Sequence, residues 1–266
     1  AMAAHPGLPN VAVFDTAFHQ TMPPSSYLYA IDAELAAEYR IRRYGFHGTS
    51  HAYVARRAVA TLGLAPDTAR IITLHLGNGA SAAAIHGGRS IDTSMGMTPL
   101  EGLVMGTRSG DVDPAIIGHL VREAGMSVVE VEAMLNKNSG LKGLCGENDL
   151  RPIHRRAAAG DPAATAALDV YVHRLRSYLG SYLVELGGAD AIVFTAGVGQ
   201  HDAAIRAATC AGMEWLGIRF DDAANSEADG SRVSVVSAAD SPIAVLVVPT
   251  DEELEIAQQT LSVLAG

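Results

Sequence analysis

The chain has 266 residues, 48% hydrophobic and 18% charged, which suits one or two globular domains and excludes a disordered tail. Its net charge is -10, and its only lysines are Lys137 and Lys142, so nucleic-acid binding, which needs a clustered positive surface, is not expected. No apolar run approaches the roughly 20 residues of a membrane span, and residues 1–10 lack the pattern of a signal peptide. We expect a cytoplasmic protein in which Cys145 and Cys210 are reduced, partly buried thiols.

Strand and helix patterns alternate along the chain, which predicts an α/β protein. Apolar runs rich in β-branched residues predict strands at residues 11–14, 71–76, 191–195, 233–236 and 243–248. Two further short strands, 81–85 and 90–92, would form a hairpin around a turn at residues 86–89.

One long helix is predicted after Asp161 and Pro162, which are typical of an N-cap and a first helical turn, and it would end at Gly187. We expect its large side chains in the core or at a subunit interface rather than in a binding site: Tyr171, Leu175, Tyr178, Leu179 and Tyr182.

The segment Gly106-Thr107-Arg108-Ser109-Gly110-Asp111 sets one arginine between two flexible glycines and among hydroxyl and carboxylate neighbours. Arginine presents a planar fork of donors that matches carboxylate and phosphate oxygens. The segment is typical of an anion clamp, although a surface turn with a solvated arginine would have the same pattern.

Two glycine pairs follow predicted strands, where open α/β sheets place their ligands. The first, within residues 75–81, matches G-x-G-x-x-A but leads into a hairpin, so it predicts a phosphate-wrapping turn without a dinucleotide fold. The second, within residues 195–200, leads into a helix from about Asp202 and would suit a nucleotide. A P-loop sequence is absent.

Three polar positions allow both a functional and a structural interpretation. Asp15 ends the first predicted strand and is either an active-site carboxylate or an N-cap. His47 and His51 have a spacing that could bind zinc, but no Glu-x-x partner supports it, and a hydrogen-bonded structural role is the default for each. Near the end of the chain, Thr250 and Glu253 predict a capping box, which leaves Asp251 and Glu252 available for a metal or a phosphate.

Five segments, residues 15–23, 44–51, 75–81, 106–111 and 249–254, resemble the acetate kinase family in this order. The most specific of the matching stretches is Val11-Ala12-Val13-Phe14-Asp15-Thr16-Ala17-Phe18-His19-Gln20-Thr21-Met22-Pro23. The resemblance implies an actin-like fold of two ribonuclease H-like domains, ATP/ADP with Mg²⁺, acetate and acetyl phosphate as substrates, and a homodimer.

The resemblance also implies roles for individual residues. Arg108 would contact the phosphoryl group in flight, His47 would hydrogen-bond it, Asp15 would orient or deprotonate the acetate, and Glu252 would hold magnesium through water. Phe46 and Pro99 would line the pocket for the methyl group. The implied nucleotide contacts are His75, Gly77, Asn78, Gly79, Asp149, Leu150, Arg151, Gly197, Val198 and Gly199.

Two departures from the family pattern qualify these expectations. The second glycine pair continues as Gln200-His201 instead of Glu-Asn. Family members also carry a long segment before Asp15, with a phosphate loop and a second arginine, so we expect an N-terminally truncated chain. Residues 1–15 would be a remnant of the first domain, residues 16–251 the C-terminal ribonuclease H-like domain, and residues 252–266 a helix of the first domain.

The alternatives to a working acetate kinase are a catalytically incompetent fragment that binds nucleotide and dimerises, and a propionate kinase. An actin-like ATPase with a chaperone or filament role is disfavoured by the segments around Arg108 and His47.

Overall fold

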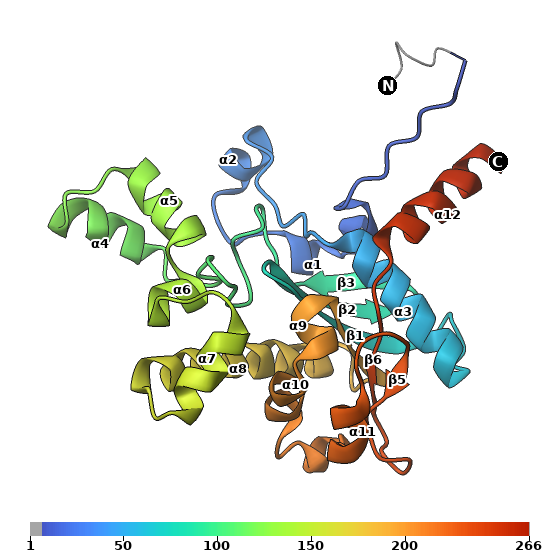
Figure 1. The fold of residues 1–266 in the computed structure, drawn as a ribbon. Helices are drawn as coiled ribbons and strands as arrows, with labels where there is room; N and C mark the ends of the chain where they lie inside the picture. Colours follow the sequence, from blue (N-terminus) through green and yellow to red (C-terminus); the bar gives the residue numbers. More distant parts are fainter. Residues whose placement is uncertain (1–6, 266) are drawn as a thin grey trace.

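A six-stranded mixed sheet with the order β3-β2-β1-β4-β6-β5 forms the centre of the molecule (Figure 1). The computed structural model describes residues 7–265, so the first six residues of the predicted domain remnant, and residue 266, lie outside it. Strands β1, β4 and β6 are parallel, whereas β2, β3 and β5 pair with their neighbours in antiparallel fashion. The strands are β1 (Arg70–Leu76), β2 (Ala80–His86), β3 (Arg89–Thr93), β4 (Ala191–Thr195), β5 (Ser234–Val235) and β6 (Ala244–Val247).

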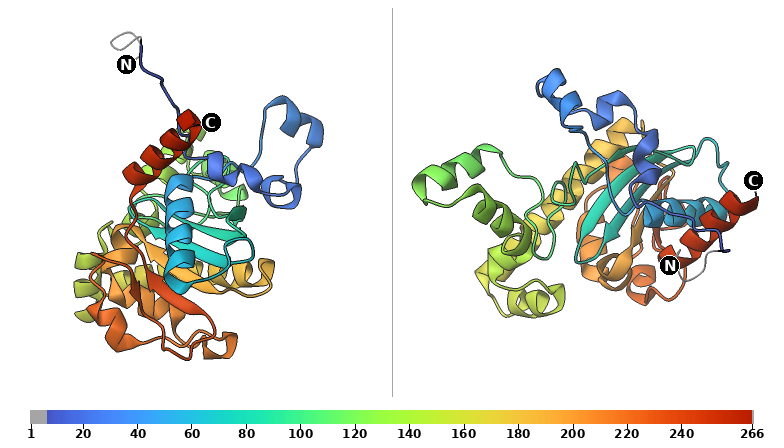
Figure 2. Two further views of the ribbon diagram at one scale, coloured as in Figure 1. Left: turned by 90° about the vertical axis from the view of Figure 1, so that its right-hand side faces the viewer. Right: turned by 90° about the horizontal axis from the view of Figure 1, so that it is seen from above.

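Helices cover both faces of the sheet (Figures 1 and 2). The helices are η1 (Ala17–Thr21), α1 (Pro24–Tyr27), α2 (Ala33–Glu38), α3 (Gly48–Leu62), α4 (Ala115–Glu123), α5 (Val128–Lys137), α6 (Gly140–Cys145), α7 (Leu150–Ala158), α8 (Pro162–Glu185), α9 (Ala196–His201), α10 (Ala203–Cys210), η2 (Glu214–Leu216), α11 (Asp222–Glu227) and α12 (Glu252–Ala265). The predicted α/β class is confirmed.

The apolar core is divided by the sheet into two clusters, because successive side chains of a strand point to opposite faces. On one face Ile72 and Leu74 of β1 belong to the cluster that contains the buried residues of α8 and α10. On the other face Ile71 lies in a smaller cluster with Val54 and Ala58 of α3. Strand β1 is therefore buried from both sides, and apart from Arg70, Thr73 and His75 its residues are all apolar.

Helix α8 confirms the predicted long helix. The Asp161 carboxylate accepts hydrogen bonds from the backbone N–H groups of Ala163 and Ala164 and so caps its first turn. Four of the five large side chains are buried and Tyr178 is half-buried, and all of them contribute to the core. Both cysteines are buried free thiols, as expected.

The predicted strand at residues 11–14 is wrong. This segment is an extended coil, and the side chain of Phe14 is 67% exposed. A strand requires a hydrogen-bonded neighbour, and within residues 7–265 no strand runs beside it.

Two parts extend away from the body. Helices α4 and α5 project to one side, and α12 continues outward beyond α3 (Figures 1 and 2). Helix α12 packs against α3 but leaves Leu261 and Val263 about two-thirds exposed. No helix of the described chain has the length and apolar character needed to cross a membrane.

Candidate active site

Two glycine-containing segments meet at the carboxyl ends of β1 and β4. These strands are parallel neighbours in which His75 pairs with Thr195, so the turn Gly77-Asn78-Gly79 lies beside the start of α9. They border a cavity of about 540 Å³, which we call the glycine-turn cavity. It is lined by Gly77, Asn78, Gly106, Leu141, Asn148, Asp149, Leu150, Arg151, Tyr171, Gly197, Val198, His201 and Asp202. Seven residues that the sequence assigned to the nucleotide are thus brought together.

Three of the residues assigned to the nucleotide do not line this cavity: His75, Gly79 and Gly199. Gly199 packs against β4, since a Cβ there would lie 3.2 Å from the carbonyl carbon of Phe194. The second glycine pair also lies within α9 itself. The predicted helix from Asp202 is a separate one, α10, which Asp202 caps by accepting from the Ile205 N–H at 3.0 Å.

Tyr171 is buried in the core, as expected, and it also lines the cavity. Its buried hydroxyl has no hydrogen-bond partner among the described residues. The helical periodicity of α8 could not reveal this, because a core tyrosine and a cavity-lining tyrosine occupy the same helical face.

The turn at Asn78 is held by the arginine loop. Gly106 N–H donates to the Asn78 carbonyl at 3.3 Å. A Cβ on Gly106 would lie only 2.5 Å from Asn78 Oδ1, so this close approach requires glycine at position 106. The loop that carries Arg108 and the glycine turn are therefore one structural unit.

Asp149 and Arg151 lie at the cavity and pair with each other. The Asp149 carboxylate caps α7 by accepting from the Arg151 N–H at 2.9 Å, and it accepts from Arg151 Nε at 3.0 Å. These bonds from the Arg151 side chain and backbone lower the pKa of Asp149 to about 2. The pair presents an ionised carboxylate and an exposed guanidinium at the cavity mouth.

Arg108 faces the other end of the glycine turn. Its Nη1 donates to the Pro99 carbonyl at 3.2 Å, and a Cβ on Gly79 would lie 3.2 Å from the same nitrogen. It forms no ion pair with an acidic side chain in residues 7–265. A guanidinium without an acidic partner beside a glycine turn can bind an anion.

His47 faces the same point as Arg108, since the Cβ position of Gly79 is 3.6 Å from His47 Nε2. The residue has a φ of 55° and precedes α3, and its backbone N–H donates to Asp15 Oδ2 at 2.6 Å. Burial lowers the pKa of His47; the Asp15 carboxylate opposes this shift, and the charge of Arg108 adds to it. The imidazole is therefore neutral near pH 7 and can donate one hydrogen bond.

Behind His47 lie three more imidazoles, and together we call them the histidine cluster: His19, His47, His51 and His75. The rings of His47 and His75 stack at a centroid distance of 4.1 Å. Burial lowers the pKa of His19 to about 4 and that of His75 to about 3, and it holds the pKa of His51 well below its usual value.

Hydroxyl groups hydrogen-bond the imidazoles of the histidine cluster. His19 bonds Ser90, His51 bonds Thr73 and Ser81, and His75 bonds Ser50. In the part of the chain that the structure describes, no three metal-binding side chains are arranged to hold an ion. His51 is thus hydrogen-bonded, as its structural interpretation expects, and the sequence motif did not reveal the serine and threonine partners because they come from β1 and β2.

Glu252 opens α12 close to Asp15. Burial and then the charge of Asp15 raise its pKa. The predicted capping box is wrong, because Asp251 Oδ1 accepts from the Leu254 N–H while Thr250 bonds the hydroxyl of Ser50. Asp251 is thus occupied as a cap, and Glu252 and Asp15 are left as two neighbouring carboxylates.

Phe46 and Pro99, the residues assigned to the methyl pocket, flank this site. Phe46 is half-buried, packs against the larger core cluster, and accepts from His19 Nε2 through its carbonyl at 3.0 Å. Pro99 is half-buried on the loop that binds Arg108. Neither residue lines the glycine-turn cavity.

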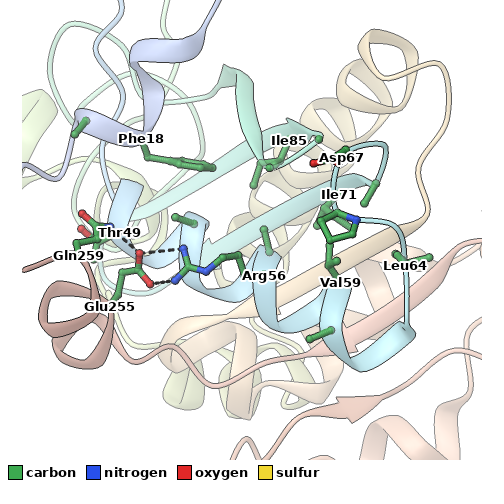
Figure 3. Close-up of a pocket in the computed structure, with 18 of the residues that line it drawn as sticks. Phe18, Thr49, Arg56, Val59, Leu64, Asp67, Ile71, Ile85, Glu255 and Gln259 are labelled. Atoms are coloured by element: carbon green, nitrogen blue, oxygen red, sulfur yellow. Dashed lines mark hydrogen bonds and ion pairs between the residues drawn. The ribbon is translucent and has the colours of Figure 1, made fainter. Parts of the chain in front are cut away.

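A second cavity, of about 800 Å³, lies beneath α12 and beside α3, and no predicted site residue lines it (Figure 3). Its wall is largely apolar and includes Phe18, Val59 and Ile71. The fully buried Glu255 carboxylate in this wall is paired with Arg56 and accepts from Gln259 Nε2 at 2.6 Å. We call it the α3 cavity.

Comparison with known proteins agrees with this geometry. The profile of the acetokinase family matches residues 1–258. An acetate kinase of Clavibacter michiganensis subsp. michiganensis is 59% identical over the whole chain, which covers 67% of that protein, and one of Streptomyces avermitilis is 60% identical over 99% of the chain and 65% of its own length.

Solved structures agree as well. The crystal structure of Porphyromonas gingivalis acetate kinase matches 99% of this chain and 66% of its own with a TM-score of 0.96 and 46% identity. A propionate kinase from Francisella tularensis matches with a TM-score of 0.89 and 46% identity over 97% of this chain and 65% of its own. The fold is thus of the actin-like α/β class. The chain belongs to the acetokinase family, and it spans about two thirds of the length of these relatives.

Proposed function

We propose that the chain acts in reversible phosphoryl transfer from ATP to acetate, giving acetyl phosphate and ADP by direct in-line transfer. The observation that carries this proposal is the convergence of Arg108 and a neutral His47 on one point beside the glycine turn. The names of the similar proteins support acetate as the acceptor.

The chemistry asks for positioning and charge compensation, because phosphoryl transfer involves little covalent work by the protein. Acetate is already ionised and needs no strong base. Arg108 stabilises the negative charge on the transferring group, and His47 donates a hydrogen bond to it. Asp15 acts as an orienting group, since its carboxylate is held by the His47 backbone N–H.

The glycine-turn cavity takes the nucleotide in this proposal. Backbone N–H groups of the turn lie toward the phosphates, and the Asp149–Arg151 pair lies toward the ribose and base. A cavity of about 540 Å³ is in the size range of ligand sites. Tyr171 adds a buried hydroxyl that the ligand or a bound water can satisfy.

Magnesium fits the carboxylates of Asp15 and Glu252. Mg²⁺ is usually bound by one or two carboxylates together with substrate phosphates and retained waters. Burial and then the charge of Asp15 raise the pKa of Glu252, and a cation held between the two carboxylates would offset both effects. When bound, the ion would neutralise charge on the phosphate oxygens. Asp15 and Glu252 would hold it, while Arg108 and His47 would contact the transferring group.

Two further proposals concern organisation. We propose a homodimer, supported by an exposed groove at α8 and η2 where Val184 and Trp215 are 79% and 81% exposed; light scattering tests it, and a monomer at all concentrations contradicts it. We also propose that residues 16–251 form the C-terminal ribonuclease H-like domain, and that residues 1–15 and 252–266 belong to the N-terminal domain.

The test is acetyl phosphate formation from acetate and Mg·ATP, trapped with hydroxylamine. The proposal is supported if the chain turns over, if Arg108→Ala abolishes this turnover, and if Arg57→Ala retains it. Arg57 is an exposed arginine of α3 and serves as the control. Equal turnover in both variants removes Arg108 from the mechanism. One methylene changes the discrimination between acetate and propionate by only about 1–3 kcal/mol. Propionate is therefore measured in parallel, and the ratio of the two kcat/KM values identifies the preferred acceptor.

A further inference from the structure

A continuous chain of hydrogen bonds runs from strand β1 to the candidate active site through two histidines. Thr73 Oγ1 lies 2.7 Å from His51 Nδ1, His51 Nε2 lies 2.7 Å from Ser81 Oγ, and Ser81 Oγ lies 2.9 Å from His47 Nδ1. Thr73, His51 and Ser81 are all 0% exposed. Bulk solvent therefore does not compete for these bonds.

The number of available hydrogens determines which group donates in each of these hydrogen bonds. Among the described residues, the Thr73 hydroxyl has one hydrogen-bond partner, His51 Nδ1. If the hydroxyl accepted there, its own hydrogen would be a buried donor without an acceptor, which costs free energy. Thr73 therefore donates to His51 Nδ1, and a neutral imidazole that accepts at Nδ1 carries its proton at Nε2.

The remaining steps follow in order. His51 Nε2–H donates to Ser81 Oγ, and the single Ser81 hydrogen is then directed to His47 Nδ1. His47, accepting at Nδ1, carries its proton at Nε2. This nitrogen faces the point beside Gly79 that Arg108 Nη1 also faces.

We propose that Thr73, His51 and Ser81 are positioning residues that hold His47 in the Nε2–H tautomer, so that it presents a donor rather than a lone pair to an anionic phosphoryl group. The consequence for catalysis rests on the proposed function. The tautomer itself does not, and it can be measured without substrate.

The first test is the tautomeric state of His47 in the ligand-free chain, from long-range ¹H–¹⁵N correlation spectra of the imidazole nitrogens near neutral pH. We expect a pyrrole-type signal for Nε2 and a pyridine-type signal for Nδ1 in both His47 and His51. A protonated Nδ1 on His47 overturns the inference.

The second test removes the hydroxyl that determines the direction. Thr73→Val should leave His51 and His47 as mixtures of tautomers and lower kcat about two- to tenfold, the range for one hydrogen bond, with an unchanged KM for ATP. Thr73→Ser should restore both. Unchanged tautomers in a folded Thr73→Val chain contradict the inference.

Two controls accompany this variant. Thr209→Val removes an equally buried hydroxyl, one that bonds the Ile205 carbonyl in α10, and should leave the histidine spectra unchanged. His75 is an internal control, because its Nδ1 bonds Ser50 and not Ser81. If His47 has the Nε2–H tautomer but the chain shows no turnover, the positioning role is supported and the proposed function is contradicted. If the chain turns over but His47 has the Nδ1–H tautomer, the proposed function is supported and the positioning role is contradicted.

Discussion

The glycine-turn cavity and the histidine cluster meet at Arg108, and they differ in the groups that form them. The glycine-turn cavity is bordered by the glycine turn and by the N-terminal ends of α7 and α9, with the Asp149–Arg151 ion pair beside them. The imidazoles of the histidine cluster are instead hydrogen-bonded to buried hydroxyls of α3, β1 and β2: Ser50, Thr73 and Ser81. The first depends on backbone conformation, and the second on the protonation of its members.

The largest expected effect is at the junction of these regions. Arg108→Ala should lower kcat about 10³- to 10⁵-fold while nucleotide affinity changes little, because the arginine acts on the transferring group rather than on the bound nucleotide. Rapid-mixing kinetics and ATP titration by calorimetry check this. A comparable loss of ATP affinity would assign Arg108 to the cavity instead.

Acidification should affect the histidine cluster first. Unfolded histidines bind protons below pH 6.5, whereas His19 and His75 in the folded chain bind them only near pH 4 and pH 3. The unfolded state thus binds more protons as the pH falls, and stability decreases from pH 6.5 downward by about 1.4 kcal/mol per pH unit for each such group.

Asp92 contributes with the opposite sign, since burial raises its pKa to about 6 and the folded state then binds the extra proton. Glu252, whose pKa is also raised by burial, acts in the same direction. Because these two carboxyl groups oppose four histidines with lowered pKa values, the net prediction is a loss of stability. Urea unfolding at pH 7 and pH 5 measures it. His19→Gln should make the free energy of unfolding depend less on pH, whereas His119→Gln, at an exposed position, should not. An equal pH dependence in the unchanged chain and both variants contradicts the assignment of this effect to the histidine cluster.

Removing the ion pair of the α3 cavity should destabilise the chain by about 1–3 kcal/mol, between the values for exposed and buried pairs. Arg56→Ala leaves the buried Glu255 carboxylate without its cation, although Arg56 is itself half-exposed (Figure 3). Arg57→Ala on the same helix should change the free energy of unfolding by less than about 0.5 kcal/mol. A stable Arg56→Ala chain would show that Glu255 takes up a proton or reaches water.

The smallest expected effect concerns the backbone of the glycine-turn cavity. Gly106→Ala pushes a Cβ against Asn78 Oδ1 and should weaken nucleotide binding about tenfold, the equivalent of 1.4 kcal/mol, without changing the pH dependence of stability. Gly180→Ala in α8, where a Cβ meets nothing within 4 Å, is the matched control and should bind nucleotide normally. Equal affinity in both variants would mean that the turn does not contact the nucleotide.

Local sequence patterns predicted the parts of the fold that depend on near neighbours. The apolar runs of β1, β4 and β6 and the Asp161 cap of α8 appear where expected, because period, burial and capping are encoded within a few residues. The strand at 11–14 failed because pairing needs a neighbour that local pattern does not supply. The capping box at Thr250 failed because Ser50, from α3, binds its hydroxyl.

By itself the sequence determined the α/β class, the family, the glycine turn and the residues that converge on it, because these depend on short motifs and backbone freedom. Tertiary structure alone decided that Tyr171 lines a cavity and that Gly199 packs against a strand. It also decided the lowered pKa of His47, since its burial and the approach of Arg108 arise only when distant segments are brought together.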